Sequence, residues 1–284
     1  MSTATHQALI RQMNELEVKT GQLAIWGLGQ MGVALKGAGS GIVYIDPVLT
    51  NVVVERVPET AAFFQRAFPA PLLPEEITNA SLVLCTHEHL DHTDPLTLGP
   101  IAQASPRARF VASAWAGSAL DEADILSERR EYPQVGQQLD FGAVKVTGVA
   151  AAHEKVETNP VMGNRFFSFH LQFDGVSFFH SGDTVMHPAY ISQIKQAGGV
   201  DVAFLAANGR DARRDSYNIT GNLQPVEAVW LAQEIGADLL IGGHNDLFTW
   251  NTVRQGGLAD AVQQVNPRQK FCTLQPGQLL FYIR

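Results

Sequence analysis

The sequence predicts an α+β protein in which several buried strands end in histidine or aspartate. Three observations predict this fold class. Apolar, β-branched runs recur along the chain, lone His or Asp residues follow several of these runs, and helical patterns lie near the N-terminus and at residues 223–236. A chain of 284 residues with 45% hydrophobic content can bury a full core, and we expect residues 1–284 to form one domain.

Residues 1–20 are expected to contain an amphipathic helix. Four apolar residues at helical spacing form a single stripe: Leu9, Ile10, Met13 and Leu16. Polar residues interrupt this segment, so it lacks the continuous apolar region of a signal peptide, and no later run reaches the roughly 18 apolar residues of a membrane span. We therefore expect the helix to pack on the protein body or on another subunit rather than on a membrane. It is the candidate contact for a homo-oligomer.

The segment LAIWGLGQMGVAL, residues 23–35, carries three glycines in the G-x-G-x-x-G spacing of dinucleotide-binding folds: Gly27, Gly29 and Gly32. Such a fold needs a long helix after the third glycine, because the helix N-terminus holds the pyrophosphate. Here the short segment VALK separates Gly32 from a second glycine-rich segment, and the apolar run IVYIDP follows. Residues 32–46 therefore predict a strand, a turn and a strand. We expect no NAD or FAD.

A dense cluster of metal-binding residue types follows a buried strand in SLVLCTHEHLDHTDP. Four of them lie close together: His87, His89, Asp91 and His92. On an extended chain His87, His89 and Asp91 share one face, and a turn at Asp91 brings His92 to a second metal. Neutral imidazoles suit ions such as zinc, while carboxylates balance charge and orient a bound water. The alternative, a solvated polar loop, explains this combination less well.

Three further candidate ligands follow predicted strands. His153 comes after the alternating run VKVTGVAAA, and His244 comes after the buried run ADLLIGG. Between them, a predicted hairpin turns at residues 174–175, and its second strand leads to Asp183. Each residue alone is more often structural, but their joint occurrence after apolar strands favours a metal site.

In order and in strand context, these residues resemble the signature of the metallo-β-lactamase superfamily, in which H-x-H-x-D-H precedes a His, an Asp and a last His. The resemblance covers residues 23–284 and implies an αββα sandwich of two mixed β-sheets flanked by helices. It also implies one metal held by His87, His89 and His153, a second held by Asp91, His92 and His244, and Asp183 as the bridge. The zinc β-lactamases usually carry a Cys at the position of Asp183, so antibiotic hydrolysis is not expected.

Longer tracts resemble the L-ascorbate-6-phosphate lactonase family, namely IWGLGQMGVALK, FHSGDT, NITGNLQPVEAVWLAQEIGAD and GGHNDLF. The third tract also has a physical explanation. It predicts a helix that begins at Pro225 and ends at Gly236, with Val226, Val229, Trp230 and the segment from Ala232 to Ala237 on its apolar face. The similarity of this tract to the lactonase family can therefore reflect a shared fold as well as a shared substrate.

The expected cofactors are two divalent metal ions, Zn²⁺ or Mn²⁺, and the expected reaction is hydrolysis by a hydroxide that bridges them. Asp91 is the expected catalytic residue, which orients the hydroxide and carries its proton. The expected substrate is a lactone or related ester of a small polar sugar acid, with or without a phosphate. A phosphodiesterase or nuclease on the same scaffold is the main alternative, and a non-catalytic metal-binding role is another.

A substrate phosphate would need guanidinium groups or polar donors near the metals. The candidate substrate-binding residues are Arg165, Asn208, Arg210, Arg213 and Arg214. The alternative for the arginines after residue 209 is pairing with Asp211 and Asp215 on a solvated loop.

Composition limits the partners and the compartment. The formal net charge of −8 and the lack of a basic stripe argue against a nucleic-acid partner. Cys85 and Cys272 lack CxxC spacing and form no disulfide framework, so a reducing compartment such as the cytoplasm is expected.

Overall fold

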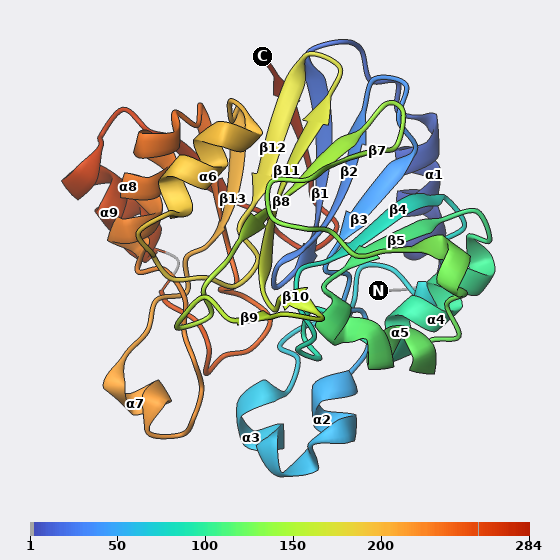
Figure 1. The fold of residues 1–284 in the computed structure, drawn as a ribbon, viewed down its shortest axis with the longest axis horizontal. Helices are drawn as coiled ribbons and strands as arrows, with labels where there is room; N and C mark the ends of the chain where they lie inside the picture. Colours follow the sequence, from blue (N-terminus) through green and yellow to red (C-terminus); the bar gives the residue numbers. More distant parts are fainter. Residues whose placement is uncertain (1–2, 255) are drawn as a thin grey trace.

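The computed structural model describes residues 3–254 and 256–284 (Figure 1). Two seven-stranded sheets pack face to face, and helices cover the outer face of each sheet. Both sheets mix parallel and antiparallel pairs. The expected α+β class and αββα metallo-β-lactamase fold are thus confirmed. Residues 1–2 of the predicted N-terminal helix lie outside the described residues.

The first sheet is antiparallel in its first half and parallel in its second half. Its strands are ordered β16 (Leu279–Ile283), β1 (Gln22–Gly29), β2 (Gly32–Gly37), β3 (Ile42–Ile45), β4 (Ala80–Cys85), β5 (Arg109–Ala112) and β6 (Arg130–Glu131). Along β1 the side chains alternate. Leu23 and Ile25 face the second sheet, while Ala24 and Trp26 face the helices.

The second sheet begins parallel and ends antiparallel. Its strands are ordered β15 (Lys270–Thr273), β14 (Leu239–Gly243), β13 (Val202–Ala206), β12 (Val176–His180), β11 (Phe167–Phe173), β8 (Lys145–Ala150) and β7 (Gln138–Asp140). A separate short pair consists of β9 (Thr158–Asn159) and β10 (Gly163–Asn164). The parallel strands β12, β13 and β14 all end at one edge, which brings the residues that follow them together.

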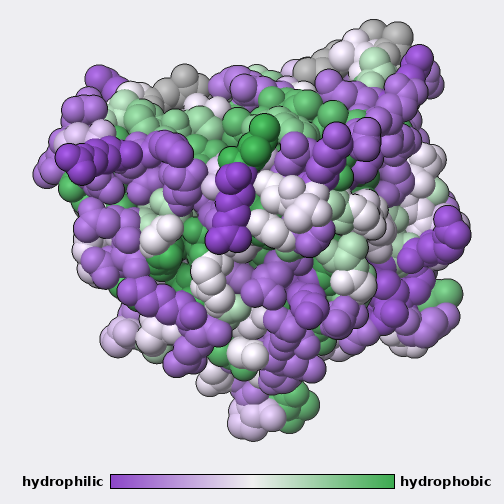
Figure 2. Space-filling model, turned by 90° about the horizontal axis from the view of Figure 1, so that it is seen from above, coloured by the Kyte–Doolittle hydropathy of each residue, from purple (hydrophilic) through white to green (hydrophobic). Residues whose placement is uncertain are grey.

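Three helices pack on the outer face of each sheet. The first sheet is covered by α1 (Thr3–Glu15), α4 (Pro95–Ala104) and α5 (Gly117–Glu122), and the second by α6 (Tyr190–Ala197), α8 (Pro225–Ile235) and α9 (Gly256–Val265). The short helices α2 (Val52–Arg56), α3 (Ala61–Phe64) and α7 (Ala212–Asp215) lie at the lower end of Figure 1. Figure 2 views the opposite end, where polar residues surround a band of hydrophobic ones. Within the described ranges, no helix combines the length and apolar character needed to cross a membrane.

The predicted N-terminal helix is present as α1, which ends at Glu15, within the expected residues 1–20. Ile10 and Met13 are buried against the core of this same chain. The helix ends where the Lys36 ammonium donates to the carbonyls of Met13 and Asn14 at 2.8 and 2.9 Å, because a cation satisfies the free carbonyls of a last turn. The role of α1 in an oligomer stays a prediction.

The glycine-rich segment forms the β1–β2 hairpin, and residues 32–46 form the predicted strand, turn and strand. Gly32 leads directly into β2 instead of a helix. A Cβ on Gly27 would lie 2.8 Å from the Gln275 carbonyl oxygen, so glycine is required here by close backbone packing.

The helix predicted within residues 223–236 is confirmed, since α8 begins at Pro225 and Gly236 ends it with a φ of 74°. The predicted apolar face is partly wrong. Val226 and Trp230 are 37% and 42% exposed. The side of the helix that packs on the second sheet carries Ala228, Val229, Leu231, Ala232 and Ile235, of which Val229, Ala232 and Ile235 belong to the predicted face.

The β11–β12 hairpin turns at residues 174–175 as predicted, and it leads to Asp183. Gly175 has a φ of 77°, and a Cβ there would lie 2.9 Å from the Gly21 nitrogen. We expect Gly175→Ala to lower the free energy of unfolding by about 1–2 kcal/mol in urea denaturation. Gly199→Ala is the matched control, because Gly199 has open space around it and no positive φ. Equal losses in the two variants would contradict this explanation.

Candidate metal centre

Four strands deliver the predicted ligands to one edge of the sandwich. β4 precedes residues 87–92, β8 precedes His153, β12 precedes Asp183 and β14 precedes His244. The ligand atoms of His87, His89 and His153 lie within 4.8 Å of one another, and so do those of Asp91, His92 and His244. We name these sets the first group and the second group.

Asp183 lies between the two groups. Its Oδ2 is 3.4 Å from His153 Nε2 of the first group and 3.1 Å from His244 Nε2 of the second. Its Oδ1 is 3.2 Å from His92 Nε2. The structure therefore brings together all seven residues that the sequence singled out as ligands, and one carboxylate contacts both groups.

The loop after β4 contains the turn expected at Asp91. The N–H groups of His92 and Thr93 both donate to the His89 carbonyl, at 2.9 and 2.8 Å, which closes a tight turn. Two of the three residues expected on one face, His87 and His89, share the first group, whereas Asp91 lies in the second. The turn leads the chain toward α4, whose N-terminus is capped by Asp94. The same turn sends His89 to the first group and His92 to the second.

Asp46 directly follows β3, and both of its carboxylate oxygens contact donors of the site. Its Oδ1 accepts from the Thr86 N–H at 2.8 Å, and its Oδ2 accepts from Thr86 Oγ1 at 2.7 Å. The same Oδ2 lies 2.8 Å from His92 Nδ1, which leaves His92 Nε2 directed at the second group. A carboxylate on the far nitrogen is the usual arrangement for an imidazole that binds a metal.

The buried nitrogens of the site fit a bound cation. Nε2 of His87 and Nε2 of His92 have no hydrogen-bond partner among the residues that the structure describes, and Oδ1 of Asp183 has none either. Buried polar atoms are normally paired, because an unpaired one costs about 1–3 kcal/mol. Imidazole nitrogens around a carboxylate are the donor set that zinc, manganese and iron accept.

The electrostatics of His87 and of Asp183 favour the protonation states that bind metals. Burial lowers the pKa of His87, and the nearby His92 and His89 lower it further. Burial alone would raise the pKa of Asp183, but His244 and His92 outweigh it and hold the pKa of this carboxyl well below its usual range. Neutral imidazole and ionised carboxylate are the ligand forms of these side chains. For His92 and His244, burial lowers the pKa, but the nearby Asp183 and Asp91 outweigh it and raise the pKa of both imidazoles.

Sequence reasoning missed three residues of the site, namely Gln30, Asp46 and Thr86. In the sequence, Asp46 stands at the end of the apolar run in IVYIDP. The available signal was an apolar strand that ends in an acid, which is the same pattern that revealed Asp183. Gln30 lies in the hairpin turn of the glycine motif and carried no spacing signal.

A pocket of about 590 Å³ opens over both groups, and His89, Asp91, His153 and Asp183 lie on its lining. Helices α2 and α3 and the loop after α7 contribute to its walls. Its apolar lining residues are Val53, Val57, Phe64, Leu90, Phe166 and Ile219. The metal groups are therefore accessible to a small molecule from one side.

Of the predicted substrate-binding residues, Arg165 lines this pocket. Its guanidinium forms ion pairs with Glu88 and Glu157, and it lies 4.9 Å from the centre of the Phe166 ring. Glu154 also lines the pocket. Two glutamates thus pair with the arginine, and a third lies on the lining of the same pocket.

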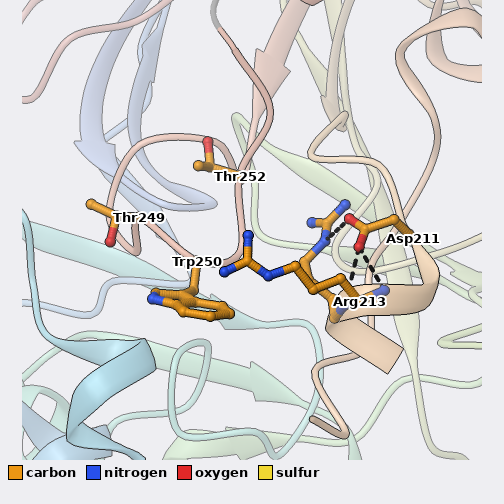
Figure 3. Close-up of a pocket in the computed structure, with 6 residues that line it drawn as sticks. Asp211, Arg213, Thr249, Trp250 and Thr252 are labelled. Atoms are coloured by element: carbon orange, nitrogen blue, oxygen red, sulfur yellow. Dashed lines mark hydrogen bonds and ion pairs between the residues drawn. The ribbon is translucent and has the colours of Figure 1, made fainter. Parts of the chain in front are cut away.

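The other four predicted substrate-binding residues are not part of the pocket lining. Arg210 pairs with Glu227 at 2.6 Å rather than with Asp215. Arg214 pairs with Asp211 at 2.7 Å, as the alternative proposed. The guanidinium of Arg213 lies over the Trp250 ring at 4.3 Å, in a separate pocket of about 350 Å³ (Figure 3). Asn208 is buried and donates to Asn251.

The fold and the site together define a metallo-β-lactamase type of protein, and the family comparison agrees. A model of the Beta-lactamase superfamily domain matches residues 43–245, and the chain belongs to this superfamily.

Two relatives are named UPF0173 metal-dependent hydrolase. The one from Pyrococcus horikoshii is 28% identical over 60% of this chain and 67% of its own length. The one from Methanobrevibacter smithii is 25% identical over 75% of this chain and 84% of its own. Among solved structures, isothiocyanate hydrolase from Delia radicum gut bacteria superposes with a TM-score of 0.68 over 92% of this chain and 100% of its own. At 13% identity, that likeness shows the fold alone.

Proposed function

We propose that this metal-dependent hydrolase opens a lactone or a related carboxylic ester of a small molecule, using two divalent cations. The observation that carries the proposal is the pair of ligand groups joined by Asp183 on the lining of an open pocket. The first group would hold one cation and the second group the other. Cations bound there would lower the pKa of a bound water and polarise the oxygen of the reacting ester.

Asp91 is the proposed proton carrier. Its side chain is 18% exposed, against 4% for Asp183, and it lies on the pocket lining. It can therefore reach a water that approaches from the pocket, accept its proton and deliver this proton to the leaving alkoxide. Asp183, which contacts three imidazoles, stays ionised and holds the two groups together.

The charges around the pocket favour a substrate without a phosphate. A phosphate dianion is best bound by unpaired guanidinium groups, but the charge of Arg165 is already balanced by Glu88 and Glu157. Glu154 adds a further negative charge to the lining. Apolar side chains of α2 and α3 on the opposite wall suit a hydrocarbon part of the substrate instead. Both features also disfavour the phosphodiesterase or nuclease alternative.

A pH-stat assay tests this function. The chain is loaded separately with Mn²⁺ and with Zn²⁺ and offered a plain lactone, a sugar-phosphate lactone and a simple phosphodiester. We expect acid release from the plain lactone in at least one metal form, with a lower kcat/KM for the phosphorylated lactone. Turnover of the phosphodiester alone would move the protein to the alternative function. Turnover of the phosphorylated lactone alone would contradict the argument from pocket charge.

A further inference from the structure

The β1–β2 hairpin turn carries Gln30 into the candidate metal centre. Gln30 follows Gly29, which pairs with Gly32 across the hairpin, and its backbone has a φ of 59°. A residue other than glycine is strained by about 1–2 kcal/mol in this left-handed region. Such strain persists where the surrounding structure fixes the conformation, and it is frequent at functional sites. The glycine motif of the sequence thus places the Gln30 side chain in the candidate metal centre rather than forming a phosphate-binding loop.

Two hydrogen bonds hold this turn against the loop that follows β14. The Gln30 N–H donates to Asp246 Oδ1 at 2.8 Å, and the Gln30 carbonyl accepts from the His244 N–H at 3.0 Å. His244 also has a positive φ, of 60°. The turn and the loop that carries a predicted ligand therefore fix each other in position.

The amide head of Gln30 lies inside the second group. The side chain is 3% exposed, and its Nε2 lies 2.9 Å from Asp91 Oδ2 and 2.9 Å from His244 Nε2. Those two ligand atoms are 3.8 Å apart. Oε1 of the same amide is buried and has no hydrogen-bond partner in residues 3–254 and 256–284. An unpaired buried carbonyl oxygen is uncommon in a folded protein, and this one belongs to an amide that contacts two candidate ligands.

We propose that Gln30 Oε1 is an additional ligand of the cation bound by Asp91, His92 and His244. The terminal torsion of glutamine is broad and roughly two-fold, so its rotation exchanges Nε2 and Oε1 within the same volume. The oxygen then points between Asp91 and His244. The amide N–H group then no longer occupies the lone pairs with which Asp91 and His244 bind a cation. This inference rests on the two-cation site of the proposed function.

An amide oxygen increases the chemical difference between the two groups. The first group offers three imidazoles, which suit zinc. The second group offers a carboxylate, two imidazoles and the Gln30 carbonyl, and oxygen ligands suit Mn²⁺ better. We therefore expect the two positions to differ in their preference for Zn²⁺ and Mn²⁺.

Calorimetric titration of the chelator-treated chain with Mn²⁺ tests the proposal on three variants. Gln30→Met keeps the length of the side chain but lacks the oxygen. Gln30→Asn keeps the amide and tolerates the left-handed backbone, but it is one methylene too short. Both variants are expected to weaken the second Mn²⁺ site at least about tenfold. The first site serves as the internal control and is expected to keep its affinity. Gln30→Glu is expected to bind the second Mn²⁺ at least as tightly as the wild type.

Gln30→Glu separates a ligand from a residue that only positions Asp91. A positioning amide acts as a donor, so a carboxylate in its place would repel Asp91 and weaken the second site. A weaker second site in Gln30→Glu would overturn the proposal. Wild-type affinity of the second site in both Gln30→Asn and Gln30→Met would also overturn it. Equal losses at both sites in Gln30→Met and Gln30→Asn would overturn it as well. A wild-type chain that binds a single Mn²⁺ would contradict the two-cation site itself.

Discussion

Asp183→Ala is expected to lower kcat/KM for lactone hydrolysis by about 10³-fold, because cation charge stabilisation of several kcal/mol depends on this carboxylate. Asp183 is the residue that contacts imidazoles of both groups, at 3.1 to 3.4 Å. Its removal leaves the imidazoles without the anion that attracts cations to them. Steady-state hydrolysis in the presence of excess Mn²⁺ or Zn²⁺ measures the effect.

His89→Ala is expected to cause a comparable loss through the first group. His170→Ala is the matched control, because His170 is a buried histidine of β11 that lies outside both groups and contacts the Gly199 carbonyl. It is expected to lower stability but to keep kcat/KM within a few-fold of wild type. Activity of Asp183→Ala within tenfold of wild type would contradict the bridging role.

Asp46→Asn is expected to weaken cation binding at the second group by about 10- to 100-fold, the usual effect of losing a partner behind a metal ligand. Three donors converge on Asp46, from the Thr86 backbone, the Thr86 hydroxyl and His92 Nδ1. The NH₂ group of an asparagine would face at least one of these donors. His92 would then lose the carboxylate that directs its Nε2 toward the site. Metal titration measures the change.

Asp201→Asn provides a matched control for Asp46→Asn. The Asp201 carboxylate likewise accepts from a backbone N–H and a hydroxyl of one residue, Ser177, but it lies outside the metal groups. Both variants are expected to lose stability. The interpretation predicts that metal affinity falls in Asp46→Asn alone, and an equal fall in both variants would indicate general destabilisation instead.

The metal groups were predictable because their signals are local. An apolar strand followed by a His or Asp can be read within ten residues, and parallel strands place such residues at one edge. The two-sheet fold followed from the resemblance that these residues carry. The hairpin at residues 174–175 was predictable for the same reason, since Asp-Gly specifies the turn.

The remaining features depend on contacts between distant segments. Asp46 and Gln30 reach His92 and His244 across separations of 46 and 214 residues, which no local pattern encodes. Arg210 pairs with Glu227 on α8, and this depends on how the loop packs against that helix. On α8 itself, residue type misled the prediction, because Trp230 is apolar yet lies on the exposed side while Ala228 packs inward.

The central claim is that two cations on the described groups carry out ester hydrolysis, and stepwise metal reconstitution tests it most directly. The chelator-treated chain is titrated with Mn²⁺ while bound metal and hydrolysis of a plain lactone are followed together. The account predicts that activity is lost on chelation and rises to its maximum at two ions per chain. Undiminished hydrolysis by the chelated chain, or full activity with a single ion, would contradict it.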